Sequence, residues 1–385
     1  MVNQGVEMSN RTLDLNFENA IGYHYDKFPP ASLDYAKLAP MLVGAAGAIA
    51  RFDQMLKNLH NSEILLAPLR NQEAVISSRM EGTVSTIDEI LKYEADFDDE
   101  EISENSQVRS DVIETYLYQR ALKSAQTAIE SGQPLSPFLI RAAHQKLLSF
   151  GRGSILTPGQ YKTEQNYLAD RSKRNILFVP ISPERLEEGM GKLFSYIDSS
   201  PDMVLIKAAI SHVEFESLHP FKDGNGRIGR MLITLLLWSN KVIAAPHFYI
   251  SGYFEEHKDE YIDMLRAVSE RDDWTGWCEF FLKAVENQAV RNLEIAENIT
   301  KLYEGMKSEF GDILSSKWSI NALNFVFTNP VFRNSKLSKS GIPTSTAARF
   351  SRLLLEKDLI RMIEEPSGRR SALYVFEPLM QLVRV

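Results

Sequence analysis

The sequence predicts a mainly α-helical protein with one short β-hairpin and a winged helix-turn-helix at its C-terminal end. Apolar residues recur every three to four positions over most of the 385 residues, which is typical of amphipathic helices. A single β-type run, NILFV at residues 175–179, predicts a hairpin rather than a full sheet. The order helix, helix, helix and two strands over residues 315–385 is typical of the winged form of the helix-turn-helix.

The N-terminal part predicts an irregular arm followed by helices. Residues 1–30 show little periodicity and contain two consecutive prolines, so we expect a partly irregular arm. A Ser-Thr pair at 85–86, followed three residues later by acidic residues, is a capping signal for a helix start. The acidic run 94–105 is interpreted as a solvated loop, and a docking surface for a basic partner is the alternative. Helices are predicted at 33–59, 69–80, 83–93 and 108–130.

The central part predicts further helices around the hairpin. Ser136 caps a helix whose first residue is Pro137, a residue with a backbone angle already suited to that position. Gly159 and a series of polar residues precede the β-type run, so residues 159–183 are predicted to form a β-hairpin or flap. The further helices are predicted at 136–150, 183–197, 203–218, 231–238, 255–270 and 274–310.

The length predicts two or three domains, because a single core rarely grows to 385 residues. We assign an N-terminal helical region to residues 1–130, a central core to 131–300 and a winged-helix domain to 301–385. In the last, 344–360 would be the recognition helix and 367–371 the basic wing. We favour a protein-contact or dimerisation role for this domain over DNA binding, because the chain carries a net charge of −8.

The composition is that of a soluble globular protein, with 44% hydrophobic and 24% charged residues. The single cysteine, Cys278, lies in an apolar run, so we expect a buried thiol and neither a disulfide framework nor a Cys-rich zinc site. The N-terminus lacks the apolar core of a signal peptide, and no apolar run is long enough to span a bilayer. We therefore expect a cytoplasmic protein that has no membrane contact.

Residues 219–230, HPFKDGNGRIGR, place charge and glycine directly before an apolar helix. Residues 224–226 tolerate unusual backbone angles, so consecutive N–H groups can face one concavity at the helix start. The N-terminal end of a helix favours an anion, and Arg227 and Arg230 share a face of the first turn. Because cations at this end disfavour the helix itself, the pattern predicts that a polyphosphate is bound there.

Two neighbouring residues fit the chemistry of a bound phosphate. Asp223 would repel phosphates unless Mg²⁺ lies between them, held by this carboxylate and by phosphate oxygens. His219 precedes it by four residues, and a neutral imidazole can take a proton from an incoming hydroxyl. Each residue type alone has an ordinary structural interpretation, as a buried histidine, a common turn or a salt bridge. Their joint occurrence predicts a phosphate site with a metal and a base.

The same stretch matches in full the signature of the Fic family, His-Pro-Phe-x-Asp/Glu-Gly-Asn-Gly-Arg-x-x-Arg, and the preceding HVEFESL and the flap ending in FVPISP also resemble that family. The resemblance implies a mostly helical core that transfers AMP from ATP to a Ser, Thr or Tyr hydroxyl of a target protein. It implies that His219 is the general base and that Asp223 binds Mg²⁺. Tyr261 is the candidate for the adenine pocket, by its position after the motif. The candidate ATP-binding residues are Gly224, Asn225, Gly226, Arg227, Ile228, Gly229 and Arg230.

A second motif, SSRMEG at residues 77–82, resembles the inhibitory motif of Fic proteins, Ser/Thr-x-x-x-Glu-Gly/Asn. On a helix, Ser77 and Glu81 share one face, and Gly82 follows directly. The resemblance implies that Glu81 pairs with Arg230 and so removes a partner of the γ-phosphate. The alternative is that Glu81 simply ends a helix. Some relatives also use this glutamate to position water and remove AMP from the target, and that second activity is left open.

The flap is where a target protein is expected to dock. In the family the flap pairs with the target backbone as an added strand, and residues 166–168 and 175–179 are the candidates. Family members often carry Arg where this chain has Lys162, and Pro where it has Ile181, so the choice of target is not transferred by the resemblance. The basic tip 171–175 would meet an acidic target, or it is a solvated turn.

Two other functions are weighed beside the AMP-transferase. A few Fic relatives transfer UMP, phosphocholine or phosphate, but the complete signature with Asp223 and both arginines favours ATP and AMP. The chain could instead be a DNA-binding regulator whose core only senses nucleotide, which predicts sequence-specific binding by residues 315–385 with a steep salt dependence. Self-modification and a homodimer are left open.

Overall fold

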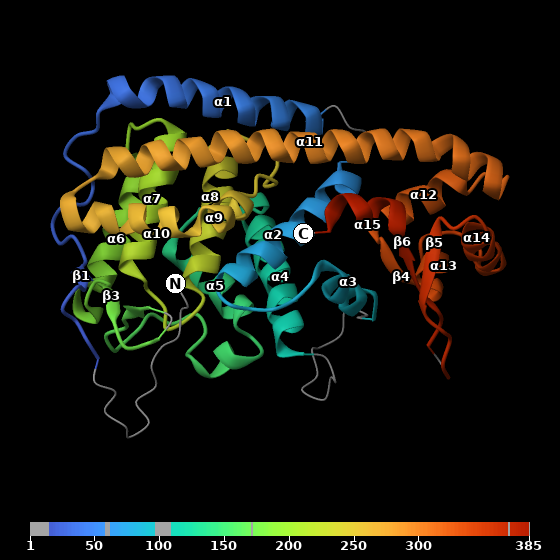
Figure 1. The fold of residues 1–385 in the computed structure, drawn as a ribbon, viewed down its shortest axis with the longest axis horizontal. Helices are drawn as coiled ribbons and strands as arrows, with labels where there is room; N and C mark the ends of the chain where they lie inside the picture. Colours follow the sequence, from blue (N-terminus) through green and yellow to red (C-terminus); the bar gives the residue numbers. More distant parts are fainter. Residues whose placement is uncertain (1–14, 58–61, 97–108, 171, 369, 385) are drawn as a thin grey trace.

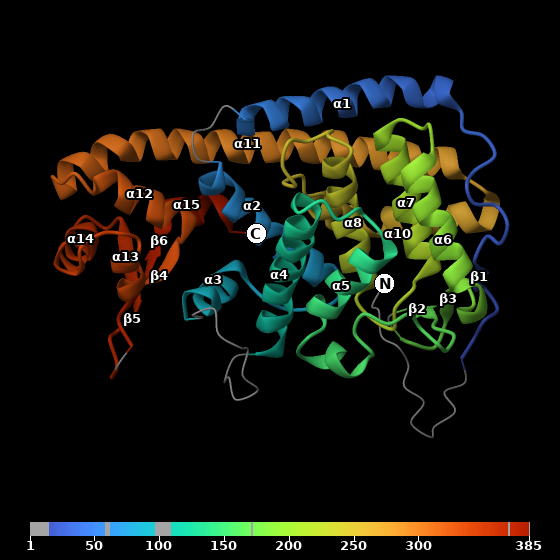
Figure 2. The same cartoon turned by 180° about the vertical axis from the view of Figure 1, so that it is seen from behind.

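The computed structural model describes residues 15–57, 62–96, 109–170, 172–368 and 370–384. Its fold is mainly helical, as predicted. Two long helices, α1 (Tyr35–Lys57) and α11 (Trp274–Leu314), lie side by side along one edge of the molecule (Figures 1 and 2). None of the described helices is both long and apolar enough to cross a bilayer. The predicted domain boundary at residue 300 falls inside α11, and the division into domains remains a prediction.

The predicted capping signal marks the start of the third helix. The N–H of Thr86 donates to Glu89 Oε2 (2.9 Å), and the N–H of Glu89 donates to Thr86 Oγ1 (3.3 Å), which is the reciprocal pattern of a capping box. Of the acidic run 94–105, only residues 94–96 are described, at the end of a helix; residues 97–105 lie outside the described part. The helices that follow α1 are α2 (Glu63–Met80), α3 (Ile87–Asp96) and α4 (Ser110–Glu130).

The central helices meet at the predicted phosphate motif. The hydroxyl of Ser136 accepts from the N–H of Leu139 (3.4 Å), so the predicted cap is present. One predicted helix, 255–270, is divided, because His257 separates two helices. The elements are α5 (Pro137–Leu147), the 3-10 helix η1 (Arg152–Ile155), α6 (Pro183–Ser199), α7 (Val204–Leu218), α8 (Asn225–Ser239), α9 (Ser251–Glu256) and α10 (Lys258–Arg271).

The flap belongs to a three-stranded sheet rather than to a hairpin alone. β2 (Leu168–Ala169) pairs antiparallel with β3 (Ile176–Val179), as the hairpin prediction requires. β1 (Ile21–Gly22) pairs parallel with the other edge of β3, which gives the order β1-β3-β2. The arm was predicted to be irregular because a two-residue strand shows no alternation. Residues 1–14 of the arm lie outside the described part.

The arm is fastened to the helix that ends at the motif. His24 Nε2 lies 2.8 Å from Glu214 Oε2, and His24 Nδ1 lies 2.7 Å from Ser269 Oγ. The hydroxyl of Tyr23 donates to Glu214 Oε1 (2.6 Å). Glu214 is part of α7, so this buried cluster connects β1, and through β1 the flap, to the helix that precedes His219.

The C-terminal elements include one strand and one helix that were not predicted. β4 (Val331–Arg333) joins the two predicted strands, β5 (Ile360–Glu364) and β6 (Leu373–Phe376), in the antiparallel order β4-β6-β5. The assignment as a winged helix-turn-helix, and DNA or protein as its partner, remain predictions. Arg369, in the predicted wing, lies outside the described residues. The helices are α12 (Ser319–Thr328), α13 (Asn334–Lys339), α14 (Thr344–Glu356) and α15 (Glu377–Val383).

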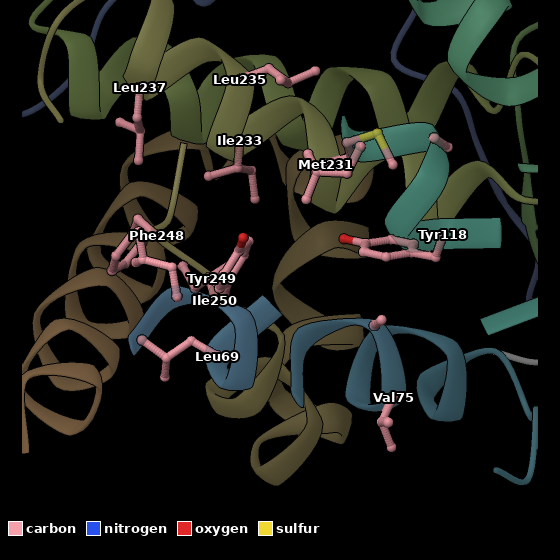
Figure 3. Close-up of a cluster of buried hydrophobic side chains, with 14 of the residues drawn as sticks. Leu69, Val75, Tyr118, Met231, Ile233, Leu235, Leu237, Phe248, Tyr249 and Ile250 are labelled. Atoms are coloured by element: carbon pink, nitrogen blue, oxygen red, sulfur yellow. The ribbon is translucent and has the colours of Figure 1, made fainter. Parts of the chain in front are cut away.

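A buried apolar cluster sets α8 against α2. Figure 3 shows Ile233 and Leu237 of α8 extending towards α2, with Tyr118 and Phe248 in the layer between the two helices. All four side chains are buried. Because closely packed side chains leave little freedom for sliding, this cluster fixes α2 relative to α8.

Candidate active site

The loop between α7 and α8 is held by the side chain of Asn225. The N–H of Phe221 donates to Asn225 Oδ1 (2.8 Å), and Asn225 Nδ2 donates back to the carbonyl oxygen of Phe221 (2.8 Å). Gly224, just before α8, has φ +78°, a left-handed conformation that favours glycine. The amide of Asn225 therefore shapes the loop, and its predicted contact with phosphate remains a prediction.

A buried histidine that the sequence analysis missed supports the same loop. The ring of His144 stacks on Phe221 with 3.7 Å between centroids, and its Nδ1 accepts from the N–H of Gly159 (2.8 Å). Its Nε2 therefore carries the proton and donates to the carbonyl oxygen of Asp223 (2.9 Å). Burial lowers the pKa of His144 to about 4, so the ring is neutral. In sequence it resembles any histidine on the apolar face of a helix.

We expect the free energy of unfolding to decrease as the pH falls from 6.5 to about 4, because of His144. Its folded-state pKa lies below the ordinary value, so the unfolded chain binds more protons and stability is lost on acidification. Urea denaturation across this range would measure the slope. In the variant His144→Gln the slope should be smaller but not zero, because burial also lowers the pKa of His212 to about 3. An unchanged slope in this variant would contradict the assignment.

The predicted base, His219, lies at the end of α7 with only 3% of its surface exposed. Its Nδ1 lies 3.3 Å from the carbonyl oxygen of Glu216, an acceptor, so Nδ1 carries the proton and Nε2 is the basic nitrogen. Burial, together with the charge of Lys162, lowers the pKa of His219 to about 3. The imidazole is therefore neutral near pH 7, which is the state a general base requires.

Arg227 is a buried cation at the start of α8 whose donors are only partly used. Its side chain is 3% exposed, and its Nη2 lies 3.5 Å from Asp223 Oδ2. Its Nε and Nη1 atoms have no hydrogen-bond partner among the described residues. The N–H of Gly224 donates to Asp223 Oδ1 (2.7 Å), and burial raises the pKa of Asp223. Buried donors without partners are costly, so their position beside a helix N-terminus indicates an anion-binding site.

The predicted contact between the two distant motifs is present. Arg230 Nη2 donates to Glu81 Oε1 (2.8 Å) and to the carbonyl oxygen of Ser77 (2.7 Å), and Arg230 Nε donates to Ser77 Oγ (2.8 Å). Burial alone would raise the pKa of Glu81, but the guanidinium of Arg230 outweighs it and holds the pKa below its ordinary value. A Cβ atom on Gly226 would lie 2.1 Å from Glu81 Oε1, so only glycine admits the carboxylate at this place.

The end of α2, which carries Glu81, is anchored on the other side by α9 and α10. Arg79 donates two hydrogen bonds to Glu255, at 2.6 and 2.7 Å. Lys258 Nζ donates to the carbonyl oxygen of Met80 (2.7 Å). Glu81 is the next residue and ends α2. It therefore both ends the helix and contacts Arg230.

One open pocket brings five of the predicted residues together. His219, Gly226, Arg230 and Tyr261 line it, and Glu81 lies in its wall. Leu168 of the flap and two apolar side chains of α10, Ile262 and Leu265, also line the pocket.

The burial and contacts of three residues in or near this pocket could not be predicted from the sequence. Ile228 is fully buried in the core, and Gly229 offers its carbonyl oxygen to His212 Nδ1 (3.1 Å). Glu216 lines the pocket, and burial raises the pKa of its carboxyl to about 8. Glu216 was missed because a carboxyl at the end of a helix usually lies in solvent.

Two protein-family models match this chain. The model of the Fic/DOC family matches residues 134–237, and that of the Fic/DOC family N-terminal region matches residues 39–127. A Fido domain-containing protein of Dictyostelium discoideum is 32% identical over 122 residues, which are 30% of this chain and 76% of that protein. The chain belongs to the Fic/DOC family.

Similarity to other proteins is partial in sequence and broad in fold. A protein adenylyltransferase Fic of Nematostella vectensis is 31% identical over 114 residues, and the match covers 29% of this chain and only 25% of that protein. The crystal structure of a Fic family protein from Desulfovibrio desulfuricans G20 aligns with 90% of this chain and 98% of that chain, at a TM-score of 0.57 and 18% identity. That likeness supports the fold.

Proposed function

We propose that the chain transfers AMP from ATP to a hydroxyl group of a target protein and that Glu81 restrains this reaction. The observation that carries the proposal is Arg227, a buried guanidinium at the start of α8 whose Nε and Nη1 have no hydrogen-bond partner among the described residues, in the same motif as the neutral imidazole of His219. Family membership and the adenylyltransferase name of the Nematostella vectensis relative support AMP as the transferred group.

The reaction requires one proton acceptor and a site for the phosphates. The oxygen of the target hydroxyl attacks the α-phosphorus of ATP, and its proton passes to Nε2 of His219. The bond between the α-phosphorus and the bridging oxygen breaks, and pyrophosphate leaves with the electron pair. The N–H groups at the start of α8 and the guanidinium of Arg227 stabilise the charge that accumulates on the phosphates. Arg230 would hold the γ-phosphate once Glu81 is displaced.

Asp223 is the residue proposed to hold Mg²⁺. Its carboxylate lies beside the buried guanidinium of Arg227, where an anion would bind. Magnesium is commonly held by a carboxylate together with phosphate oxygens. Bound there, Mg²⁺ would neutralise part of the phosphate charge. EDTA is therefore expected to abolish AMP transfer, and added Mg²⁺ to restore it, in the labelling assay described below.

Restraint by Glu81 follows from competition for one arginine. The Nε and Nη2 donors of Arg230 are occupied by Ser77 and Glu81, and the carboxylate adds negative charge above Gly226, where a phosphate would lie. ATP bound in that state would be misplaced for in-line attack. The target is proposed to dock at the outer side of β2, because β1 of the same chain already pairs with the other edge of β3.

The test compares ATP radiolabelled at the α-phosphate with ATP radiolabelled at the γ-phosphate, using the full chain carrying Glu81→Gly. We expect protein-bound label only from the α-labelled nucleotide, either on the chain itself or on proteins of a cell extract. Label only from the γ-position would instead assign phosphate transfer. Absence of label from both, with ATP binding demonstrated by calorimetry, would overturn the proposed function.

A further inference from the structure

The backbone around His219 is held by two residues at the root of the flap. Four consecutive carbonyl oxygens, those of residues 218–221, accept hydrogen bonds from Lys162 and Asn166. Lys162 Nζ donates to the carbonyl oxygen of Leu218 (3.1 Å), and its backbone N–H donates to that of Pro220 (2.8 Å). Asn166 Nδ2 donates to the carbonyl oxygens of His219 and Phe221, both at 3.1 Å.

The two residues act as one unit, because Lys162 Nζ also donates to Asn166 Oδ1 (2.7 Å). This bond orients the amide of Asn166 so that its nitrogen faces the backbone of His219. His219 needs such support, since its φ of +47° is an uncommon conformation for a residue with a side chain. Conformations of this kind persist only where the surroundings hold them.

The environment of Lys162 is unusual for a buried cation. The residue is 3% exposed, and its partners are an amide and carbonyl oxygens; among the described residues no carboxylate pairs with it. Burial lowers the pKa of Lys162 to about 7. A lysine that served only stability would be expected to face a carboxylate, because an unpaired buried charge is costly.

We propose that Lys162 is a positioning residue for the AMP transfer proposed above, which this inference presupposes: with Asn166 it holds the strained backbone of His219 so that the imidazole faces the attacking hydroxyl. Lys162 is not a catalytic residue, because it acts through Asn166 and the backbone. The ammonium also lies close enough to His219 to disfavour a second positive charge there.

Several other titratable groups line the same pocket as His219. They come from the end of α2, from α7, α8 and α10, and they are Glu81, Glu216, Arg230, Lys258 and Tyr261. Replacing Lys162 by methionine leaves all of these in place and removes one positive charge. The pKa of His219 should therefore rise, since its protonated form becomes less unfavourable.

The experiment uses the full chain with Glu81→Gly as the parent and measures kcat and the KM for ATP as functions of pH. In Lys162→Met we expect kcat to fall about 10- to 100-fold, the scale of a misplaced catalytic group. We expect little change in the KM for ATP, because Lys162 lies outside the phosphate-binding residues. The acidic limb of the kcat profile should move to higher pH, and Lys162→Arg should restore both kcat and the limb towards the parent.

The matched control is Lys192→Met, which removes an exposed lysine of α6 and should behave like the parent. Circular dichroism would show that each variant is folded. A parent-like kcat in Lys162→Met, or a reduced kcat with an unmoved acidic limb and no rescue by arginine, overturns the proposal.

A second measurement does not depend on activity. The pKa of His219 can be followed by NMR, with the signal assigned by its loss in His219→Asn. Lys162→Met should raise this pKa whether or not the parent transfers AMP, and an unchanged pKa overturns the proposal. Absence of label from the parent itself would instead contradict the proposed function, so the two failures are distinguishable.

Discussion

Replacing Glu81 by glycine is expected to raise the initial rate of AMP transfer about 10- to 150-fold, because a hydrogen bond between charged groups contributes about 1.5–3 kcal/mol. In the folded chain Glu81 Oε1 accepts from Arg230 at 2.8 Å and lies over Gly226. Removing the carboxylate would free Arg230 for the γ-phosphate and would remove a negative charge from the proposed phosphate site. Initial rates with α-labelled ATP, at saturating and subsaturating concentrations, would measure the change.

Two further variants distinguish the effect of the negative charge of Glu81 from the effect of its volume and of the contact with Ser77. Glu81→Gln keeps the size of the side chain but loses its charge, so its rate should lie between those of the wild type and Glu81→Gly. Ser77→Ala removes the acceptor of Arg230 Nε but keeps the carboxylate of Glu81, so it should activate less than either. Equal rates in the wild type and Glu81→Gly, with equal ATP affinity, would mean that the contact ends α2 without restraining the enzyme.

Replacing His219 by alanine in the Glu81→Gly parent is expected to lower the rate of AMP transfer by about 10²- to 10⁴-fold, the usual contribution of a general base. The imidazole is neutral near pH 7 because burial, together with Lys162, lowers its pKa to about 3. Bound phosphates bring negative charge nearby and will raise that pKa, which increases its strength as a base. Single-turnover labelling would measure the chemical step.

Measuring the affinity for ATP distinguishes a variant that has lost catalysis from one that has lost its folded structure. His219→Ala should retain the ATP affinity of its parent, because the predicted phosphate contacts come from Arg227, Arg230 and the start of α8. Calorimetric titration of both proteins would establish this. A single-turnover rate close to that of the parent would assign the base to another group, and Glu216 would then be the first residue to examine.

The pattern-bearing parts of the fold could be predicted from the sequence. Helices with apolar periodicity, such as α1 and α7, were placed within a few residues, because the spacing of buried side chains records the helical period. The cap at Ser136 was predicted correctly, and of the two candidates Ser85 and Thr86 the structure has Thr86, since a capping side chain contacts a backbone group only three residues away. Elements without periodicity, β1 and β4, were missed.

In the candidate site, too, some residues could be predicted from local sequence and others could not. The residues of 219–230 stand together in the chain, so their chemistry could be inferred from the order of the amino acids alone. His144, Lys162 and Glu216 could not be assigned, because their roles depend on what surrounds them after folding. Lys162 stood out only as a departure from a family pattern.

The sequence by itself determined the helical class and the family signature, because both depend on the local spacing of residues. The roles of His219 as base, Asp223 as metal ligand and Glu81 as inhibitory residue stay predictions, and that of Glu81 rests on a resemblance to the family motif. Only the tertiary structure decided that β1 pairs with the flap and that Lys162 and Asn166 hold the backbone of His219. Contacts between distant segments depend on how buried surfaces pack, and packing depends on the whole chain rather than on any single stretch.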